Sequence, residues 1–205
     1  MTRRGVLAAA SAGVVAVLLS GCVGGTDTPA TPTSTPTLSV LTFEDGAALD
    51  PAQVVAWTDP LVTADGYTRA VAEGTTGSWS YTSAVTGCIL GYQQVPLTSE
   101  ESADDDAAAS DALLAASFSA TVDEIAPYVE DGPGRFLTQS GIVETRAALG
   151  ADRGTTYLIS ARALSAVGIG FLGSLSCPQS IDVAAEWDRL NAESRAFELF
   201  FSAAG

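Results

Sequence analysis

Two absences limit the chemistry open to this chain of 205 residues. It contains no histidine, and all nine of its basic residues are arginine. Without an imidazole or a lysine amine, the chain cannot build a Ser-His-Asp triad, a Cys-His pair or a Schiff base. Three cysteines and 24 acidic residues remain. These residue types serve lipid attachment, disulfide formation, cation binding and carboxylate catalysis.

The first cysteine follows a basic and then apolar N-terminus. Arg3 and Arg4 precede an uncharged run over residues 5–19, which is typical of an export signal and shorter than the ~20 residues of a bilayer span. Residues 19–22, LSGC, resemble the lipobox of bacterial lipoproteins. That resemblance implies a signal peptide cleaved before Cys22, a diacylglycerol on its sulfur, and residence on the extracytoplasmic face of the cell membrane. The alternative is an ordinary secretory signal in which the cysteine stands by chance.

The export route has two alternatives. Residues 2–7, TRRGVL, resemble a twin-arginine signal, although Val6 stands where that family usually has phenylalanine. General secretory signals also begin with paired arginines. The twin-arginine route implies that the domain folds in the cytoplasm and forms any disulfide after export.

The mature chain divides into a stalk and a domain. Residues 22–37 combine the lipidated cysteine with a Thr/Pro-rich stretch that predicts a disordered stalk, and its fifteen residues after Cys22 would reach roughly 45 Å. Residues 38–205 predict one globular domain. Loss of residues 1–21 removes two arginines and no acid, so the net charge changes from −15 to −17. Such a charge excludes nucleic acid as a partner and leaves the lipid to bind the membrane.

Cys88 and Cys177 are the remaining cysteines. An even pair in an exported domain predicts a structural disulfide. A metal site built on two thiolates would need further soft ligands, and the chain has no histidine to supply one. No cofactor is expected.

Carboxylates leave two further hypotheses open. Glu144 lies in a predicted strand, flanked by Arg146, and is a candidate for glycoside hydrolysis by a pair of acids, although a surface ion pair across the hairpin is the ordinary interpretation. Acidic groups at 100–106, 123–124 and 130–131 are candidates for calcium. None has the spacing of a calcium loop, and helix-start electrostatics account for such groups without a metal.

Two other patterns have a functional and a structural interpretation. Trp79 and Tyr81 lie two residues apart, so they share one strand face and form a binding patch if that face is open. Residues 168–173, GIGFLG, match the G-x-G-x-x-G of dinucleotide-binding proteins. A strand and Pro178, rather than a helix, follow the last glycine, so we interpret these glycines as permitting close packing.

The elements that must position these residues can be outlined from periodicity. Strands are predicted near 38–43, 67–71, 79–85, 88–95, 142–149, 155–164 and 171–177. The hairpin 142–164 is expected to pair residues whose numbers add up to 304. One helix should begin near Asp104 and be ended by Pro127 and by residues 131–134, and its stripe comprises Leu114, Phe118, Val122, Ile125 and Val129. A last helix should be capped by Ser180, with a stripe of Val183, Trp187, Leu190, Phe197 and Phe201.

The order of strands, helix, strands and helix predicts an α+β domain. We expect an antiparallel sheet with two helices packed on one face and one disulfide. This plan is similar to the Mog1/PsbP-like fold of some actinobacterial lipoproteins, a likeness that covers the second half of the domain and implies no functional residues. The missing catalytic equipment favours a non-enzymatic binding or assembly module with an envelope protein or a glycan as partner. The alternatives are a carboxylate-dependent hydrolase of wall polysaccharide and a calcium-dependent adhesion module.

Overall fold

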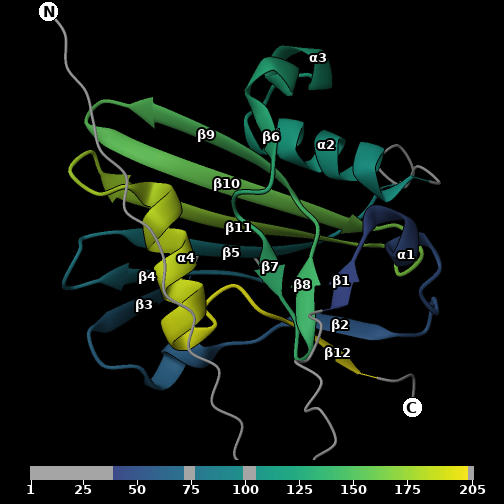
Figure 1. Cartoon of the computed structure of the whole chain (residues 1–205), viewed down its shortest axis with the longest axis horizontal. Helices are drawn as coiled ribbons and strands as arrows, with labels where there is room; N and C mark the ends of the chain where they lie inside the picture. The colour runs from purple at the N-terminus through teal and green to yellow at the C-terminus, as the bar shows by residue number, and fades with distance from the viewer. Residues whose placement is uncertain (1–38, 72–76, 99–104, 203–205) are drawn as a thin grey trace, which may run out of the picture. The chain divides into compact units, whose positions relative to one another are not determined.

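A computed structural model describes residues 39–71, 77–98 and 105–202 (Figure 1). In this part of the chain one antiparallel sheet dominates. Its seven strands lie in the order β3 (Tyr67–Val71), β4 (Ser78–Ser83), β5 (Ile89–Pro96), β11 (Ile169–Pro178), β10 (Thr155–Leu164), β9 (Arg146–Asp152) and β6 (Val129–Asp131). The predicted α+β class and antiparallel sheet are therefore confirmed.

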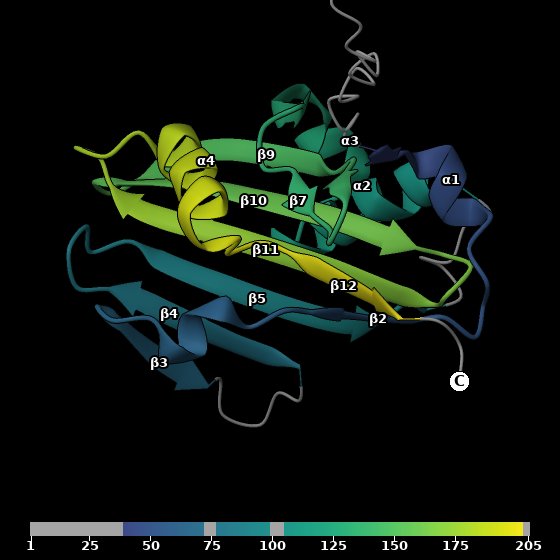
Figure 2. The ribbon, with the colours of Figure 1, turned by 60° about the horizontal axis from the view of Figure 1, so that its bottom comes forward.

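Smaller elements pack around the main sheet (Figure 2). The helical segments are α1 (Phe43–Ala47), η1 (Pro60–Thr63), α2 (Asp106–Ser117), α3 (Val122–Ile125), η2 (Ala126–Tyr128) and α4 (Val183–Ser194). The short strands are β1 (Ser39–Leu41), β2 (Val54–Trp57), β7 (Phe136–Leu137), β8 (Gly141–Val143) and β12 (Leu199–Ser202). Among them β1 pairs in parallel with β8, and β12 pairs antiparallel with β2.

The two long helices cover opposite faces of the sheet. Leu114 of α2 packs in one cluster with Leu172 of β11. Trp187 of α4 packs in another with Phe171 and Leu175 of the same strand. Because neighbouring strand residues point to opposite faces, the expectation that both helices share one face is wrong. The apolar stripes predicted that each helix packs on the sheet. They did not indicate on which face, because the central strands are apolar on both faces.

The hairpin β9–β10 has a different register from the predicted one. Paired residues such as Leu149 and Leu158 have numbers that add up to 307, not 304. The cause is a tight turn at Arg153 and Gly154, which both have positive φ (46° and 87°), as in the two-residue type I′ turns of hairpins. The register is therefore shifted by three residues, an odd number. As a result Leu149 and Ile159, which were expected on one face of the sheet, lie on different faces.

Both predicted helices are shorter in the structure than in the sequence interpretation. After α2, Ser119 adopts a left-handed φ of 54°, and Thr121 with Glu124 forms a capping box that starts α3. The last helix begins at the N-cap Asp182 rather than at Ser180 and ends before left-handed Arg195. Side chains beyond each break still reach the expected cores, because the chain continues along the same sheet face.

Candidate functional site

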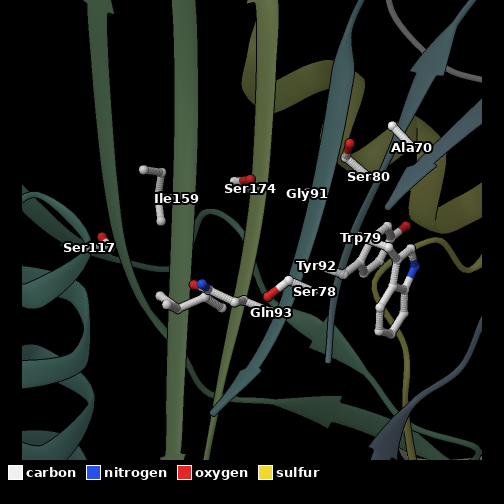
Figure 3. A pocket seen from close by; sticks show the side chains of 11 residues that line it. Ala70, Ser78, Trp79, Ser80, Gly91, Tyr92, Gln93, Ser117, Ile159 and Ser174 are labelled. Atoms are coloured by element: carbon white, nitrogen blue, oxygen red, sulfur yellow. The ribbon is translucent and has the colours of Figure 1, made fainter. Parts of the chain in front are cut away.

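The aromatic pair singled out from the sequence lies on the sheet face that packs against α4. Tyr81 is 1% exposed, and half-buried Trp79 stacks on Tyr92 with 5.4 Å between the ring centroids (Figure 3). The Tyr81 hydroxyl donates a hydrogen bond of 2.6 Å to Asp59 Oδ1. Burial, and then this hydrogen bond, raises the pKa of Tyr81 to about 12. Tyr81 therefore lies in the core without an open ring face, whereas Trp79 is only partly buried, packs against that core and is also among the residues lining the groove described below.

Arg69 of β3 covers the outer side of this aromatic group. Its guanidinium carbon lies 5.4 Å from the Trp79 ring centroid and 5.9 Å from that of Tyr81. Its Nη1 is 3.2 Å from Asp59 Oδ2. Cation–π contacts of this kind stabilise by ~0.5–1 kcal/mol at exposed sites. Sequence reasoning missed Arg69 because only the pairing of β3 with β4 brings it to these rings.

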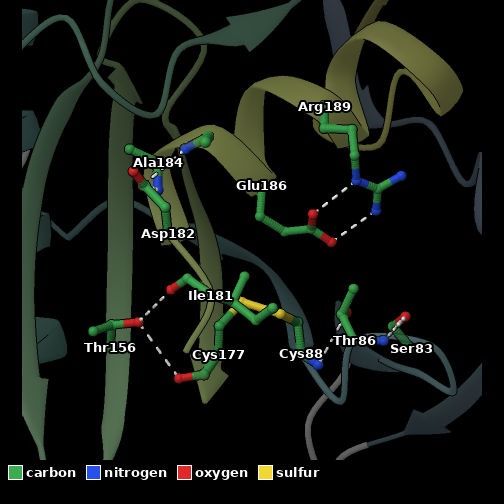
Figure 4. Close-up of a disulfide and its surroundings, with 11 residues drawn as sticks. Ser83, Thr86, Cys88, Thr156, Cys177, Ile181, Asp182, Ala184, Glu186 and Arg189 are labelled. Carbon is green, nitrogen blue, oxygen red and sulfur yellow. Dashed lines mark hydrogen bonds and ion pairs between the residues drawn. A yellow bond between two sulfur atoms is a disulfide. The ribbon is translucent and has the colours of Figure 1, made fainter. Parts of the chain in front are cut away.

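Cys88 and Cys177 form the predicted disulfide (Figure 4). Cys177 lies in β11, Cys88 immediately precedes the neighbouring β5, and their Cα atoms are 4.2 Å apart. Both residues are fully buried. The bond closes a sequence separation of 89 residues, for which the chain-entropy model gives an upper bound of about 4 to 5 kcal/mol of stabilisation, against about 2 to 4 kcal/mol for typical disulfides.

Glu144 lies in a hollow with three other acidic residues. Most of these carboxylates already accept hydrogen bonds from groups of the fold. Its Oε2 accepts from the Phe43 amide over 3.0 Å. Asp106, in the same hollow and 1% exposed, accepts from the Ser165 amide over 2.8 Å and from Arg162. Asp105 caps α2, and Glu44 is exposed on α1. The arrangement fixes α1 and α2 to the sheet rather than presenting a matched pair of free carboxyl groups.

Arg162 forms the centre of this buried polar cluster. Its guanidinium donates to Asp106 Oδ2 at 3.2 Å, to the Thr42 carbonyl at 2.7 Å and to the Glu144 carbonyl at 3.1 Å. The Phe43 ring lies over it, with its centroid 4.4 Å from the guanidinium carbon. Burial lowers the pKa of Arg162 to about 10, and the charge of Asp106 acts in the opposite direction. At neutral pH Arg162 therefore keeps its charge, and its contact with Asp106 is structural.

The acidic groups considered for calcium are dispersed. In the described ranges, no three acidic or cysteine side chains lie close enough to hold a metal ion, and residues 100–104 lie outside those ranges. Glu124 accepts hydrogen bonds from the Thr121 amide and hydroxyl, and Asp131 pairs with Arg146. These acids cap a helix and join two strands.

The glycines of residues 168–173 serve close packing, as the sequence predicts. Gly168 lies in the turn between β10 and β11 with φ of 74°. A Cβ on Gly170 would lie 2.7 Å from Leu113 of α2, and one on Gly173 would lie 3.0 Å from Trp187. No helix begins after them, because they enter β11.

A surface that the sequence reasoning missed lies on the α2 face of the sheet. There α2 packs on β9, β10 and β11, whereas outward residues of β3 and β4 such as Thr68 and Thr82 are exposed. The strand register aligns one small or aliphatic residue from each of five strands (Figure 3). That row is Ala70, Ser80, Gly91, Ser174 and Ile159.

A groove of about 340 Å³ follows this row, and none of its lining residues is charged. We call it the serine groove. Its polar lining comprises Ser78, Ser80, Gln93, Ser117 and Ser174. Gly91 forms part of the floor, where a Cβ would lie only 2.4 Å from Ser174 Oγ. The volume falls in the range of ligand sites, ~300–1,000 Å³.

One groove hydroxyl is used by the fold, since Ser117 Oγ donates to the Leu114 carbonyl over 2.6 Å, whereas those of Ser78, Ser80 and Ser174 are not. Within the described residues, Ser78 Oγ is buried and has no hydrogen-bond partner. No described group accepts from or donates to the hydroxyl of Ser80 or Ser174, in contrast to buried Ser160, which donates to the Gly134 carbonyl over 2.6 Å. A hydroxyl can donate once and accept twice, so the half-buried Ser80 and Ser174 side chains are available to a ligand.

An aromatic hollow of about 330 Å³ lies beside the groove. Its lining includes Phe118 and Tyr157, whose ring centroids are 6.1 Å apart. Tyr157 is one side chain further along the same face of β10 than Ile159 of the groove. Exposed Tyr128 also lines this hollow.

One sequence signal could have found the groove. Residues 78–82, SWSYT, alternate small hydroxyl residues with aromatic ones. The aromatic half predicts the buried face, so the other half should face outward. Attention to the aromatic rings as ligand contacts concealed this second interpretation.

Comparisons of the chain with protein-family models, with curated proteins and with solved structures find no match. The likenesses to lipoproteins and to the Mog1/PsbP-like fold therefore stay predictions. Cys22 and the stalk lie outside the described residues. Among the helices of the described ranges, none is long and apolar enough to cross a membrane.

Proposed function

We propose that the protein is a lipid-anchored, extracytoplasmic binding module of the cell envelope. Cys22 and the stalk 23–37 hold the domain on the outer face of the cell membrane. The observation that carries the proposal is the serine groove, an open and uncharged surface in which the hydroxyls of Ser80 and Ser174 have no hydrogen-bond partner among the described residues.

Two features of the domain support an extracytoplasmic site of action. The Cys88–Cys177 disulfide suits the oxidising compartments outside the cytoplasm. The net charge of −17 after removal of residues 1–21 gives the surface little attraction for anionic lipid headgroups. The lipid on Cys22 is then the source of membrane attachment.

The groove supports binding rather than catalysis. A nucleophilic serine needs an adjacent general base, and the lining residues include no acid, and the whole chain has no histidine or lysine. Hydroxyl and amide groups around an aliphatic floor are suited to holding a ligand without changing it.

The proposal is tested by expressing the full chain in a bacterium that processes lipoproteins. Wild type should enter the membrane fraction and carry a diacylglycerol by mass, whereas Cys22→Ser should lose the lipid. Membranes that bear the wild type should retain wall material from the source organism. Ser80→Trp fills the groove and should abolish this retention.

Val85→Trp is the matched control, because Val85 is 89% exposed in the turn between β4 and β5 and lies outside the groove lining. It should retain wall material as the wild type does. Equal retention by Ser80→Trp and wild type contradicts the role of the groove, and a chain without lipid contradicts the anchor.

A further inference from the structure

Resting on the proposed function, we infer that the serine groove binds a neutral polysaccharide. The first argument is charge. The chain carries 24 acidic residues, yet none of the residues lining the groove is charged. A phosphate or carboxylate on the ligand would find no cation there, and an ammonium group would find no carboxylate. The ligand that matches such a lining has no formal charge.

The second argument is the kind of hydrogen-bonding group on offer. A sheet face presents side chains, whereas its backbone groups are engaged between strands. Strand addition by an extended peptide uses backbone pairing at a sheet edge, whereas this groove runs across the face of five strands. The groove offers the hydroxyls of Ser80 and Ser174 and the amide of Gln93. Each hydroxyl donates and accepts, which matches a ligand whose own polar groups are hydroxyls.

The third argument is the apolar part of the lining. Ile159 and Leu172 lie beside the serines, and Gly91 keeps the floor low, since a Cβ would reach Ser174 Oγ. A sugar ring has hydroxyls at its rim and C–H groups on its faces, so it pairs with this mixture. The rings of Phe118 and Tyr157 in the adjoining hollow add aromatic surface for a further sugar unit.

The test uses the full chain in detergent and measures binding by titration calorimetry. The probes are three neutral polysaccharides (dextran, mannan and galactan), anionic polygalacturonate and cationic chitosan. At least one neutral polysaccharide should bind, and the two charged ones should not. Ser80→Trp should weaken that binding more than 30-fold, and Val85→Trp should leave it unchanged.

A second variant removes a contact without filling the groove. Ser174→Ala takes away one hydroxyl and should weaken binding about 2- to 10-fold, the effect of one hydrogen bond. Thermal unfolding of each variant in the same detergent shows whether its fold is kept. Neutral binding that Ser80→Trp and Ser174→Ala both leave unchanged overturns the inference.

The remaining outcomes separate this inference from the function on which it rests. If only polygalacturonate or chitosan binds, the ligand is not neutral and the inference is overturned. If no polysaccharide binds but Ser80→Trp still abolishes retention of wall material, the ligand class is overturned and the binding module stands. If wall retention is also unchanged by Ser80→Trp, the proposed function fails as well.

Discussion

The Arg162 cluster and the serine groove are both polar regions on the same sheet, but their polar atoms differ in their partners. The Arg162 guanidinium is buried and donates to Asp106 and to two backbone carbonyls. The hydroxyls of Ser80 and Ser174 contact no described polar group. The first region therefore maintains the fold, and the second is free for a ligand. Partners, rather than residue type, distinguish a structural polar group from a functional one.

The largest expected effect comes from breaking the buried ion pair. Asp106→Ala should lower the free energy of unfolding by about 3 to 5 kcal/mol, because it leaves the Arg162 charge buried without its carboxylate. Urea unfolding of the full chain in detergent measures this change. The double variant Asp106→Leu/Arg162→Met should recover much of the loss, since no buried charge remains.

The exposed pair Arg153–Asp152, with 3.7 Å between its charged atoms, is the matched control. Asp152→Ala should change stability little, as surface ion pairs do. If Asp106→Ala costs no more than Asp152→Ala, the Arg162 cluster does not differ from the surface and the comparison fails.

The disulfide gives the next largest effect, and it joins two strands that form the groove. Cys88→Ala/Cys177→Ala should lower stability by about 2 to 4 kcal/mol, because the unfolded chain gains freedom. Denaturant unfolding with and without a reductant measures it. The reductant should destabilise the wild type and leave the double variant unchanged, and a similar loss in both would contradict the prediction.

Alkaline pH should reveal the hydrogen-bonded tyrosine on the opposite face. Between its ordinary pKa of about 10 and its raised pKa of about 12, Tyr81 is ionised in the unfolded chain and protonated in the folded one. The unfolded state then binds fewer protons, so stability falls as pH rises, by about 3 kcal/mol in total.

The free energy of unfolding of wild type and of Tyr81→Phe, measured across pH 9 to 12, gives the pH-dependent contribution of Tyr81 to stability. The variant lacks the titrating group, so the wild type's advantage should shrink as pH rises. A constant difference between the two proteins over this range would show that the Tyr81 hydroxyl has an ordinary pKa in the fold.

The smallest effect on stability is expected for a serine of the groove, Ser80. Buried Ser110, whose hydroxyl has partners, serves as the comparison. Ser110 Oγ donates to the Asp106 carbonyl over 2.6 Å and accepts from the Ala163 amide over 2.8 Å. Ser110→Ala should therefore cost about 1 to 3 kcal/mol, whereas Ser80→Ala should stay within about 0.5 kcal/mol. Chemical denaturation compares them, and equal costs would show that the Ser80 hydroxyl also supports the fold.

Local sequence signals predicted several elements well and two connections poorly. The Cys88–Cys177 pair and the strand glycines of residues 168–173 could be predicted, since compartment and flanking residues constrain them. The Arg153-Gly154 turn was overlooked because five turn-forming residues, 150–154, obscured which two make it. Thr121 and Glu124 form a capping box, which indicates that a new helix begins after α2. This signal was missed because the apolar stripe continues across the break.

The sequence by itself determined the alternation of exposed and buried residues, the α+β class, the disulfide and the absence of histidine and lysine chemistry. These follow from local periodicity and composition. Only the tertiary structure decided that α2 and α4 lie on opposite faces, that Arg162 meets Asp106, and that serines from two separate strands and from α2 form one groove. Such contacts join residues far apart in the chain, and they depend on strand register and on the area each helix covers, which no local pattern specifies.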